Sequence, residues 1–165
     1  MPSNTEHNDN APNLRAVAEL FDHFMRAIYS RSFVEGLNPA QWSALRFLGR
    51  ANPRSRTLTE FARFHMVSKS AASDTMAALV RKQLIVKSRD PEDGRIMRLE
   101  LTERGRELLE IDPLNHLVSA LQELTPAQQE AAAALAGAIA RNVFAGLTRS
   151  AAEDETRSAD RRKAL

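Results

Sequence analysis

Residues 84–105 read LIVKSRDPEDGRIMRLELTERG and hold two short runs that are typical of β-strands. The first is the apolar run Leu84-Ile85-Val86, and the second, residues 96–101, alternates between apolar and polar side chains. Residues 89–95 between them are charged and contain a proline and a glycine, which favour turns. This segment therefore predicts a β-hairpin with an exposed, cationic tip.

Three helix starts precede the hairpin. Asn38-Pro39-Ala40-Gln41 combines an N-cap asparagine, a proline at the first helical position and a glutamine at the third. Thr57-Leu58-Thr59-Glu60 has the pattern of a capping box, and Ser68 heads a third helix over residues 69–82. The second and third helices meet at the tight connection Met66-Val67. Three helices followed by a hairpin predict a winged helix-turn-helix.

Further helices are expected on both sides of this region. Thr102-Glu103-Arg104-Gly105 opens one that Pro113 must interrupt, and Thr125-Pro126-Ala127-Gln128 begins the last. The N-terminal helix has an apolar stripe and ends at Gly36. The stripe consists of Leu14, Val17, Phe21, Phe24 and Ile28, with Ala18, Met25, Tyr29 and Phe33 beside it. The apolar edge of the last helix consists of Leu135, Ile139, Val143 and Leu147.

The length and composition suit one folded domain with irregular ends. The chain has 165 residues, of which 43% are hydrophobic and 27% charged, as in ordinary soluble proteins. We expect residues 14–149 to fold, residues 1–13 to be disordered and the charged residues 150–165 to form a mobile tail. The expected fold class is mostly α with a small β-hairpin wing.

Several classes of function are excluded by what the sequence lacks. It has no cysteine, which excludes disulfides, thiolate metal sites and thiol redox chemistry. Its four histidines have no metal-ligand spacing, so neither a metal nor a cofactor is expected. It contains no phosphate-binding loop or nucleophile motif, so we do not expect an enzyme. Without a signal sequence or a long apolar stretch, the expected location is the cytoplasm.

The distribution of charge points to a polyanionic partner. The net charge of the chain is only +2, yet residues 52–106 hold twelve Lys and Arg against seven Asp and Glu, a local net charge of +5. Short polar side chains at the start of a helix can enter the major groove of DNA, and a cationic turn can reach the minor groove. The candidate contacts on the third helix are Ser68, Lys69, Ser70, Ser73 and Thr75, and those on the wing are Arg89 and Arg95.

Residues 37–109 resemble the MarR family of bacterial transcriptional regulators. The matching segments are Leu37-Asn38-Pro39-Ala40-Gln41-Trp42, Val67-Ser68-Lys69-Ser70-Ala71, Asp90-Pro91-Glu92-Asp93-Gly94-Arg95 and Leu101-Thr102-Glu103-Arg104-Gly105. The resemblance implies a winged helix-turn-helix over residues 38–103, with dimerisation helices over residues 14–35 and 104–149. It also implies that Asp93 orients Arg95 for the minor groove.

The resemblance further implies a homodimer that binds a pseudo-palindromic operator in double-stranded DNA. Family members commonly repress nearby genes and release DNA when a small aromatic or anionic effector binds. The residues expected to flank such an effector site are Phe24, Met25, Ile28, Trp42 and Leu45, although core packing also explains each of them. Possible anion partners are Arg15, His23, Arg26 and Arg46.

Three positions depart from the family pattern. Asp74 stands on the recognition helix where a basic residue is common, and it would repel phosphate unless it accepts from a cytosine amine or pairs with an arginine. Gln83 replaces a glycine that commonly ends this helix, at a cost of roughly 1 kcal/mol if its conformation is left-handed. His65 occupies a position that is usually apolar, and a partly buried structural role is expected.

An alternative interpretation stays open at this stage. A winged helix can bind protein or RNA instead of operator DNA, because a fold does not determine a function. Asp74 favours this alternative, since a carboxylate on the recognition helix weakens the attraction to phosphate.

Overall fold

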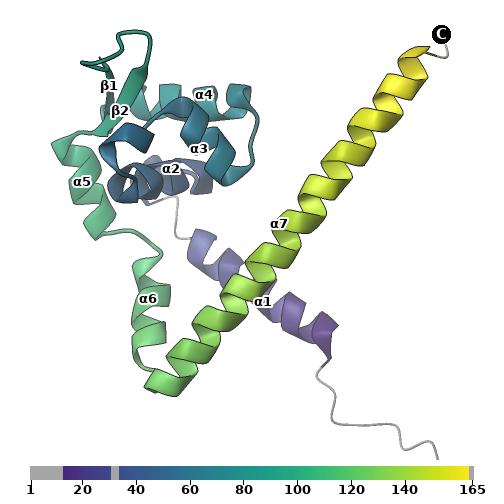
Figure 1. Ribbon diagram of the computed structural model, residues 1–165. Coiled ribbons are helices and arrows are strands. Elements are labelled where there is room, and N and C mark those ends of the chain that lie inside the picture. Colours follow the sequence, from purple (N-terminus) through teal and green to yellow (C-terminus); the bar gives the residue numbers. More distant parts are fainter. Residues whose placement is uncertain (1–12, 31–33, 164–165) are drawn as a thin grey trace, which may run out of the picture. The chain divides into compact units, whose positions relative to one another are not determined.

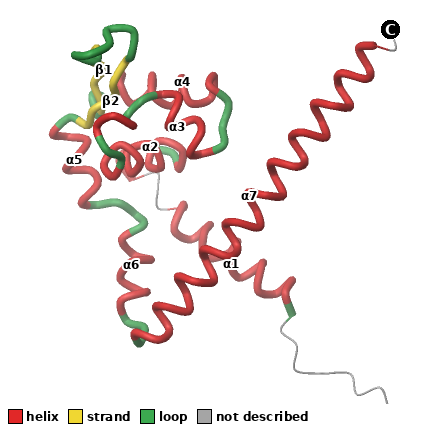
Figure 2. The backbone as a smooth tube through the Cα atoms, in the orientation of Figure 1, coloured by secondary structure: helices red, strands yellow, loops and turns green. Residues whose placement is uncertain are grey.

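A computed structural model describes residues 13–30 and 34–163, and it confirms a mostly helical fold with a single two-stranded hairpin in that part of the chain (Figures 1 and 2). The predicted disorder of residues 1–13 falls almost wholly outside the described residues. The helices are α1 (Leu14–Ser30), α2 (Pro39–Arg50), α3 (Leu58–His65), α4 (Lys69–Arg81), α5 (Glu103–Glu110), α6 (Asn115–Gln122) and α7 (Pro126–Lys163). The strands are β1 (Ile85–Arg89) and β2 (Met97–Leu101), and short 3-10 turns span Val34–Gly36 and Pro53–Ser55. The chain divides into two compact units, Met1–Leu117 and Val118–Leu165.

α2 begins as its sequence predicts and supplies the centre of the core. The Asn38 side chain accepts the N–H of Gln41 at 2.9 Å, and the Gln41 side chain accepts the N–H of Asn38 at 3.2 Å. These two bonds complete a capping box ahead of Pro39. Four side chains of α2 are fully buried: Trp42, Ala44, Leu45 and Leu48. α4, β2 and α5 pack against α2.

The helix-turn-helix consists of α3, a tight turn and α4. Thr57 caps α3, and Met66 at its end adopts the left-handed conformation, with φ 52° and ψ 40°. The N–H of Val67 then bonds to the Ala62 carbonyl at 3.1 Å, which closes the turn. Ser68 caps α4, and one face of α4 buries Ala72, Met76 and Leu79 in the core. The predicted connection at residues 66–67 is therefore confirmed.

The hairpin extends from the core as a wing (Figure 2). β1 and β2 are antiparallel, with Ile85 opposite Leu101 and Arg89 opposite Met97. Ile85 and Leu99 are buried, which anchors the base of the wing. The N–H of Leu99 also bonds to the carbonyl of Arg56 at 2.8 Å, so β2 pairs with the segment that leads into α3.

The segment after the wing is bonded tightly to the end of α4. Thr102 donates its hydroxyl to the carbonyl of Gln83 at 2.8 Å and its N–H to that of Leu84 at 3.0 Å. The Thr102 hydroxyl also accepts the N–H of Gly105 at 3.0 Å and so caps α5. A Cβ on Gly105 would lie 2.2 Å from the Leu84 carbonyl oxygen, so this close approach requires glycine. Gln83 has φ 58° and so adopts the left-handed conformation, the case in which its replacement of glycine carries a cost.

The helices after the wing differ from the prediction in one respect. α5 ends at Glu110 and α6 begins at Asn115, so Pro113 interrupts the helix as expected. α7, however, continues to Lys163, beyond residue 149 where we expected helix to give way to a tail. Residues 150–163 are rich in Ala, Glu and Arg, which are charged or small but also good helix formers. No helix among the described residues is long and apolar enough to cross a membrane.

Candidate nucleic-acid interface

The N-terminal half of α4 presents short polar side chains to solvent. Lys69, Ser70 and Ser73 are exposed, whereas Ala72 and Met76 of the same helix lie in the core. The apolar face of α4 therefore packs in the core, and its opposite, polar face is exposed to solvent. Such a helix end fits the ~12 Å width of the major groove, because its side chains are short enough to let the backbone approach.

Two of the predicted contact residues on α4 already make bonds within the helix. The Ser68 hydroxyl accepts the N–H of Ala71 at 3.1 Å as the N-cap, which leaves its own proton available to a phosphate. The Thr75 hydroxyl donates to the Ala71 carbonyl at 2.9 Å, and Thr75 is half-buried. The geometry thus favours Lys69, Ser70 and Ser73 over Thr75 as contact residues.

Asp74 lies on the same open face of α4. It is exposed, and no cation among the described residues forms an ion pair with it. The internal arginine partner considered for it is therefore absent from this part of the chain. Its carboxylate remains an acceptor that faces outward beside Ser70 and Ser73.

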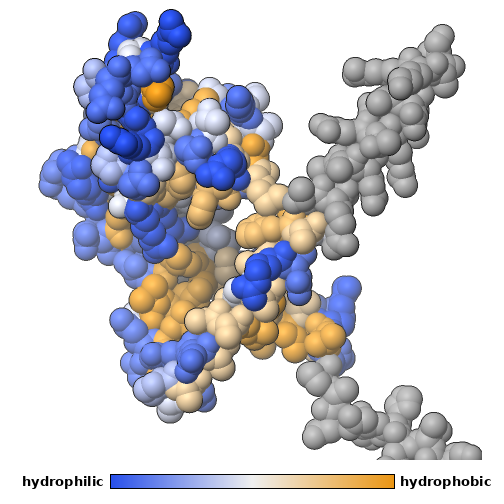
Figure 3. Space-filling model, viewed as in Figure 1, coloured by the Kyte–Doolittle hydropathy of each residue, from blue (hydrophilic) through white to orange (hydrophobic). Residues whose placement is uncertain are grey.

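The wing carries the predicted cations at its tip. Arg89 ends β1 and Arg95 lies in the turn, and both are exposed without a carboxylate partner in the portion of the chain that the structure describes. The carboxylate of Asp93 accepts the backbone N–H of Arg95 at 3.0 Å. Asp93 therefore orders the backbone that bears Arg95, rather than pairing with its guanidinium. Figure 3 shows hydrophilic side chains over the hairpin.

Asp90 organises the turn from its other end. Its carboxylate accepts the N–H groups of Glu92 and Asp93, each at 2.9 Å, and its own N–H donates to the Ile96 carbonyl at 2.9 Å. The bonds from Asp93 and Glu92, followed by the one from Arg98, lower the pKa of Asp90 below its ordinary value. Asp90 therefore remains an acceptor-only carboxylate at neutral pH and fixes the turn.

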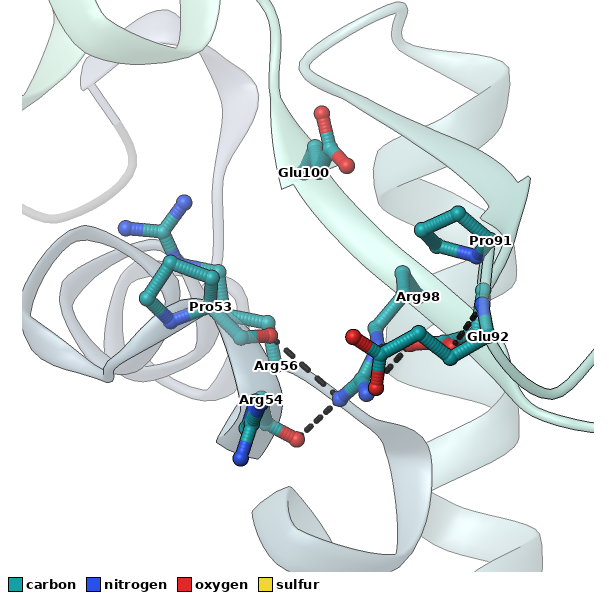
Figure 4. A pocket seen from close by; sticks show the side chains of 8 residues that line it. Pro53, Arg54, Arg56, Pro91, Glu92, Arg98 and Glu100 are labelled. Carbon is teal, nitrogen blue, oxygen red and sulfur yellow. Dashed lines mark hydrogen bonds and ion pairs between the residues drawn. The ribbon is translucent and has the colours of Figure 1, made fainter.

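Sequence reasoning missed Arg98, which links the wing to the rest of the domain. Its guanidinium donates to the carboxylate of Asp90 and to the backbone carbonyls of Pro53 and Arg54. Figure 4 shows Arg98 reaching from β2 towards these carbonyls, across a cavity of about 280 Å³ that Arg56, Glu92 and Glu100 also line. Only 15% of the Arg98 side chain is exposed. The only sequence signal for Arg98 is its place in the predicted second strand, where it lies opposite Ser88.

None of the five residues expected to flank an effector site lines either of the two cavities described for this chain. Trp42 and Leu45 are fully buried core residues, and Phe24, Met25 and Ile28 are half-buried on α1. Three of the possible anion partners already pair with carboxylates. Arg46 bonds to Asp112, Arg15 to Glu19 and Arg26 to Asp22.

A larger cavity of about 570 Å³ lies beside α2 and α3. Exposed Phe64 and half-buried Phe47 and His65 form its aromatic wall, with ring centroids 5.1–6.1 Å apart. Arg50 also lines it and is exposed, with no ion-pair partner in the described ranges. The Nε2 atom of His65 is buried and has no hydrogen-bond partner among the described residues, and burial lowers the pKa of this imidazole. His65 is thus partly buried, as the sequence predicted, and its lowered pKa favours the neutral form.

Comparison with known proteins finds similarity over part of this chain. Residues 35–96 match the family model described as MarR family. The chain is 36% identical over 74 residues to the uncharacterized HTH-type transcriptional regulator YpoP of Bacillus subtilis (strain 168), a stretch that covers 45% of this chain and 51% of YpoP. It therefore spans about half the length of this curated relative.

Solved structures share the fold over most of the chain. A probable transcriptional regulator from Pseudomonas aeruginosa is 27% identical, with a TM-score of 0.57 and coverage of 78% of this chain and 95% of that one. A mutant of MepR from Staphylococcus aureus bound to an oligodeoxyribonucleotide has a TM-score of 0.55 at 18% identity, with coverage of 81% and 99%. The expectation that the chain is not an enzyme agrees with these relatives. The matched segment, residues 35–96, holds the helix-turn-helix and the wing tip, so this part of the chain is similar to the MarR family.

Proposed function

We propose that this protein is a homodimeric transcriptional regulator that binds a specific site in double-stranded DNA. The observation that carries the proposal is the combination of an open, polar face on α4 with two exposed arginines at the tip of the wing that have no ion-pair partner among the described residues. The DNA-bound structure of MepR supports the proposal, because its fold is similar to the one described here. A regulator of this kind acts in the cytoplasm, where bacterial DNA lies.

Each part of the interface has its own task in this proposal. Lys69, Ser70 and Ser73 enter the major groove, and Ser68 donates its remaining proton to a phosphate. Arg89 and Arg95 follow the minor groove, where the negative potential is strongest. Thr75 is assigned a supporting role, since its hydroxyl is bonded to its own helix.

Homodimerisation is supported by the surface of α7. Leu135, Ile139, Val143 and Leu147 recur at intervals of four residues, and each is 39–54% exposed. An isolated helix with such a stripe gains its stability from a partner that covers it. A second copy of the chain would supply an identical stripe, and a two-fold symmetric dimer would match a pseudo-palindromic operator.

The repressor role and the response to an effector are the finer part of the proposal. A compound that binds better to a dimer whose recognition helices are wrongly spaced shifts the population away from the DNA-binding state. The cavity lined by Phe64, His65 and Arg50 has the size of a small-molecule site and offers aromatic contacts and one cation. Trp42 and Leu45, by contrast, could be reached only if the core opened.

The test is a titration of the purified protein with duplexes selected from a randomised pool, at two salt concentrations. We expect tight binding that weakens steeply with salt, because phosphate contacts release counterions. Arg95→Ala should weaken binding and lower the salt dependence by about one unit of the logarithmic slope. Arg104→Gln, which removes an exposed cation from α5, is the matched control and should change binding little.

Two outcomes would redirect the proposal. If the protein binds single-stranded RNA but no duplex DNA, it is a winged-helix interaction module instead. If Arg95→Ala and Arg104→Gln have equal effects on duplex binding, the attraction is a general effect of charge and the wing is not part of the interface.

A further inference from the structure

We propose that Arg98 positions the wing for DNA binding without touching DNA itself. The inference rests on the proposed function and assigns a new task within it. Arg98 lies in β2, yet its guanidinium faces the 3-10 turn Pro53–Ser55 (Figure 4). The same guanidinium donates to the carboxylate of Asp90. It would hold the hairpin in one orientation relative to the helix-turn-helix, so that Arg95 meets the groove in the correct place.

A continuous chain of bonds leads from the body of the domain to Arg95. Arg98 donates to the carbonyls of Pro53 and Arg54, which belong to the segment before α3. The same guanidinium pairs with Asp90, whose carboxylate fixes the turn through its bonds to Glu92 and Asp93. The Asp93 carboxylate then accepts the N–H of Arg95 at 3.0 Å. Each link is an intact bond in a described segment, and Arg98 is the only link that reaches the turn Pro53–Ser55.

The chemistry of the site suits arginine and excludes a direct contact with DNA. Only 15% of the Arg98 side chain and 9% of the Asp90 side chain are exposed. A guanidinium presents five donors in a planar fork and can serve a carboxylate and two carbonyls together, which an ammonium on a flexible stem does less well. The guanidinium of Arg98 therefore donates its hydrogen bonds within the domain, whereas Arg89 and Arg95 are exposed to solvent.

The wing needs this additional contact with the rest of the domain, because its two strands alone fix its orientation only weakly. A two-stranded hairpin is marginally stable by itself, and residues 90–96 lie beyond the end of the strand pairing. The backbone bond from Leu99 to Arg56 secures only the base of the hairpin. A wing that moved about this base would have to be ordered on binding, and that ordering would reduce the affinity.

The experiment is a double-mutant cycle of Arg98→Gln and Arg95→Ala, measured on a duplex selected by the wild-type protein. Arg98→Gln alone should weaken binding about tenfold, within the range of one lost contact. In the Arg95→Ala background the same change should weaken binding less than about twofold, because the contact that Arg98 positions is already gone. Arg104→Gln should have the same small effect in both backgrounds, which controls for the loss of one charge.

Amide hydrogen exchange separates positioning from folding. In Arg98→Gln we expect faster exchange in residues 90–96, while the amides of Trp42, Leu45 and Leu48 in α2 keep their protection. Arg98→Lys keeps the charge but lacks the fork, so it should behave like Arg98→Gln. Wild-type affinity in Arg98→Lys would overturn the proposal, as would equal effects of Arg98→Gln in both backgrounds. Loss of protection throughout α2 in both variants would also overturn it, because Arg98 would then be required for the fold itself.

Different experimental results would contradict the positioning role of Arg98 and the proposed function. A wild-type protein that binds no duplex removes the proposed function and the positioning role with it. A wild-type protein that binds duplex DNA, beside an Arg98→Gln variant that binds equally well, removes only the positioning role.

Discussion

Arg46 in α2 and Asp112 after α5 form a buried bidentate ion pair, with Nε–Oδ2 and Nη2–Oδ1 distances of 2.5 and 2.6 Å. Only 11% and 7% of the two side chains are exposed. The Asp112 carboxylate also accepts the N–H of Leu114 at 2.8 Å, just before α6. The pair therefore joins the central helix of the core to the connection between α5 and α6.

Asp112→Ala should lower the free energy of unfolding by about 3–5 kcal/mol, because it leaves a buried guanidinium without its partner. Denaturant unfolding measures this loss. Glu19→Ala, which breaks the exposed Arg15–Glu19 pair, is the control and should lower it by less than about 0.5 kcal/mol. The double change Arg46→Met with Asp112→Leu should be less harmful than Asp112→Ala. Equal losses for Asp112→Ala and Glu19→Ala would show that the buried pair contributes no more than a surface pair.

Gly105→Ala should destabilise the protein by about 1–3 kcal/mol or more, because the new Cβ would lie 2.2 Å from the Leu84 carbonyl oxygen. Gly146→Ala in α7 is the matched control, since nothing lies within 4 Å of its Cβ position. In a helix that change should stabilise by about 0.5–1 kcal/mol. Thermal unfolding of both variants checks the opposite signs, and a neutral Gly105→Ala would mean that α5 can shift away from Leu84.

The local features of this fold could be predicted from the sequence, because each depends on neighbouring residues. The capping box of Asn38 and Gln41 and the turn of the hairpin are examples. The side-chain contacts between distant segments could not be predicted in this way. Arg46 and Asp112 are 66 residues apart, and Arg98 lies 44 residues from Arg54, so no short pattern links them.

Two further differences between the sequence-based expectations and the structure have physical reasons. The end of α7 carries charged residues that the sequence analysis assigned to a tail, yet those residue types also favour helices. Trp42 and Leu45 have the apolar character shared by cores and ligand pockets, and only the packing shows that both are core residues. The polar face of α4 was predicted well, because its apolar positions already placed the opposite face in the core.

The stability should depend on pH through His65. Burial among Phe47, Phe61 and Phe64 lowers the pKa of this imidazole below 6.5 in the folded chain. Between the folded and unfolded pKa values the unfolded chain binds more protons, so the free energy of unfolding should fall as the pH drops below about 7. The loss should level off below the folded pKa.

Denaturant unfolding at several pH values checks this dependence. His65→Phe should remove part of the slope, because phenylalanine cannot take up a proton. His116→Phe, at an exposed site in α6, controls for the loss of an imidazole. A slope that persists unchanged in His65→Phe would assign the pH dependence to other groups.

A glutamate in the apolar stripe of α7 should dissociate the proposed dimer. Ile139→Glu places a charge at the centre of the stripe, where a second copy would otherwise bury the side chain. Ala134→Glu adds the same charge at an exposed position on another face of the helix and should leave the dimer intact. Sedimentation equilibrium measures the mass of each variant, and a monomeric wild-type protein would contradict the dimer outright.

Asp74 should set the base preference of the recognition helix. Its unpaired carboxylate on the open face of α4 can accept a hydrogen bond from the N4 amino group of cytosine, whereas adenine is bound best by an asparagine or glutamine side chain. Asp74→Asn should therefore change the preferred base at one position of each half-site from cytosine to adenine. The discrimination at that position should be about 1–3 kcal/mol.

Asp74→Ala should lose the discrimination at that position and slightly raise the affinity for all duplexes, because a charge that repels phosphate is gone. Selection from a randomised pool followed by sequencing gives the preference of each variant. Glu107→Gln, which removes an exposed carboxylate from α5, is the control and should leave the preference unchanged. If both Asp74 variants and the wild type select the same half-site, Asp74 faces away from the bases, and the specificity must come from Lys69, Ser70 and Ser73.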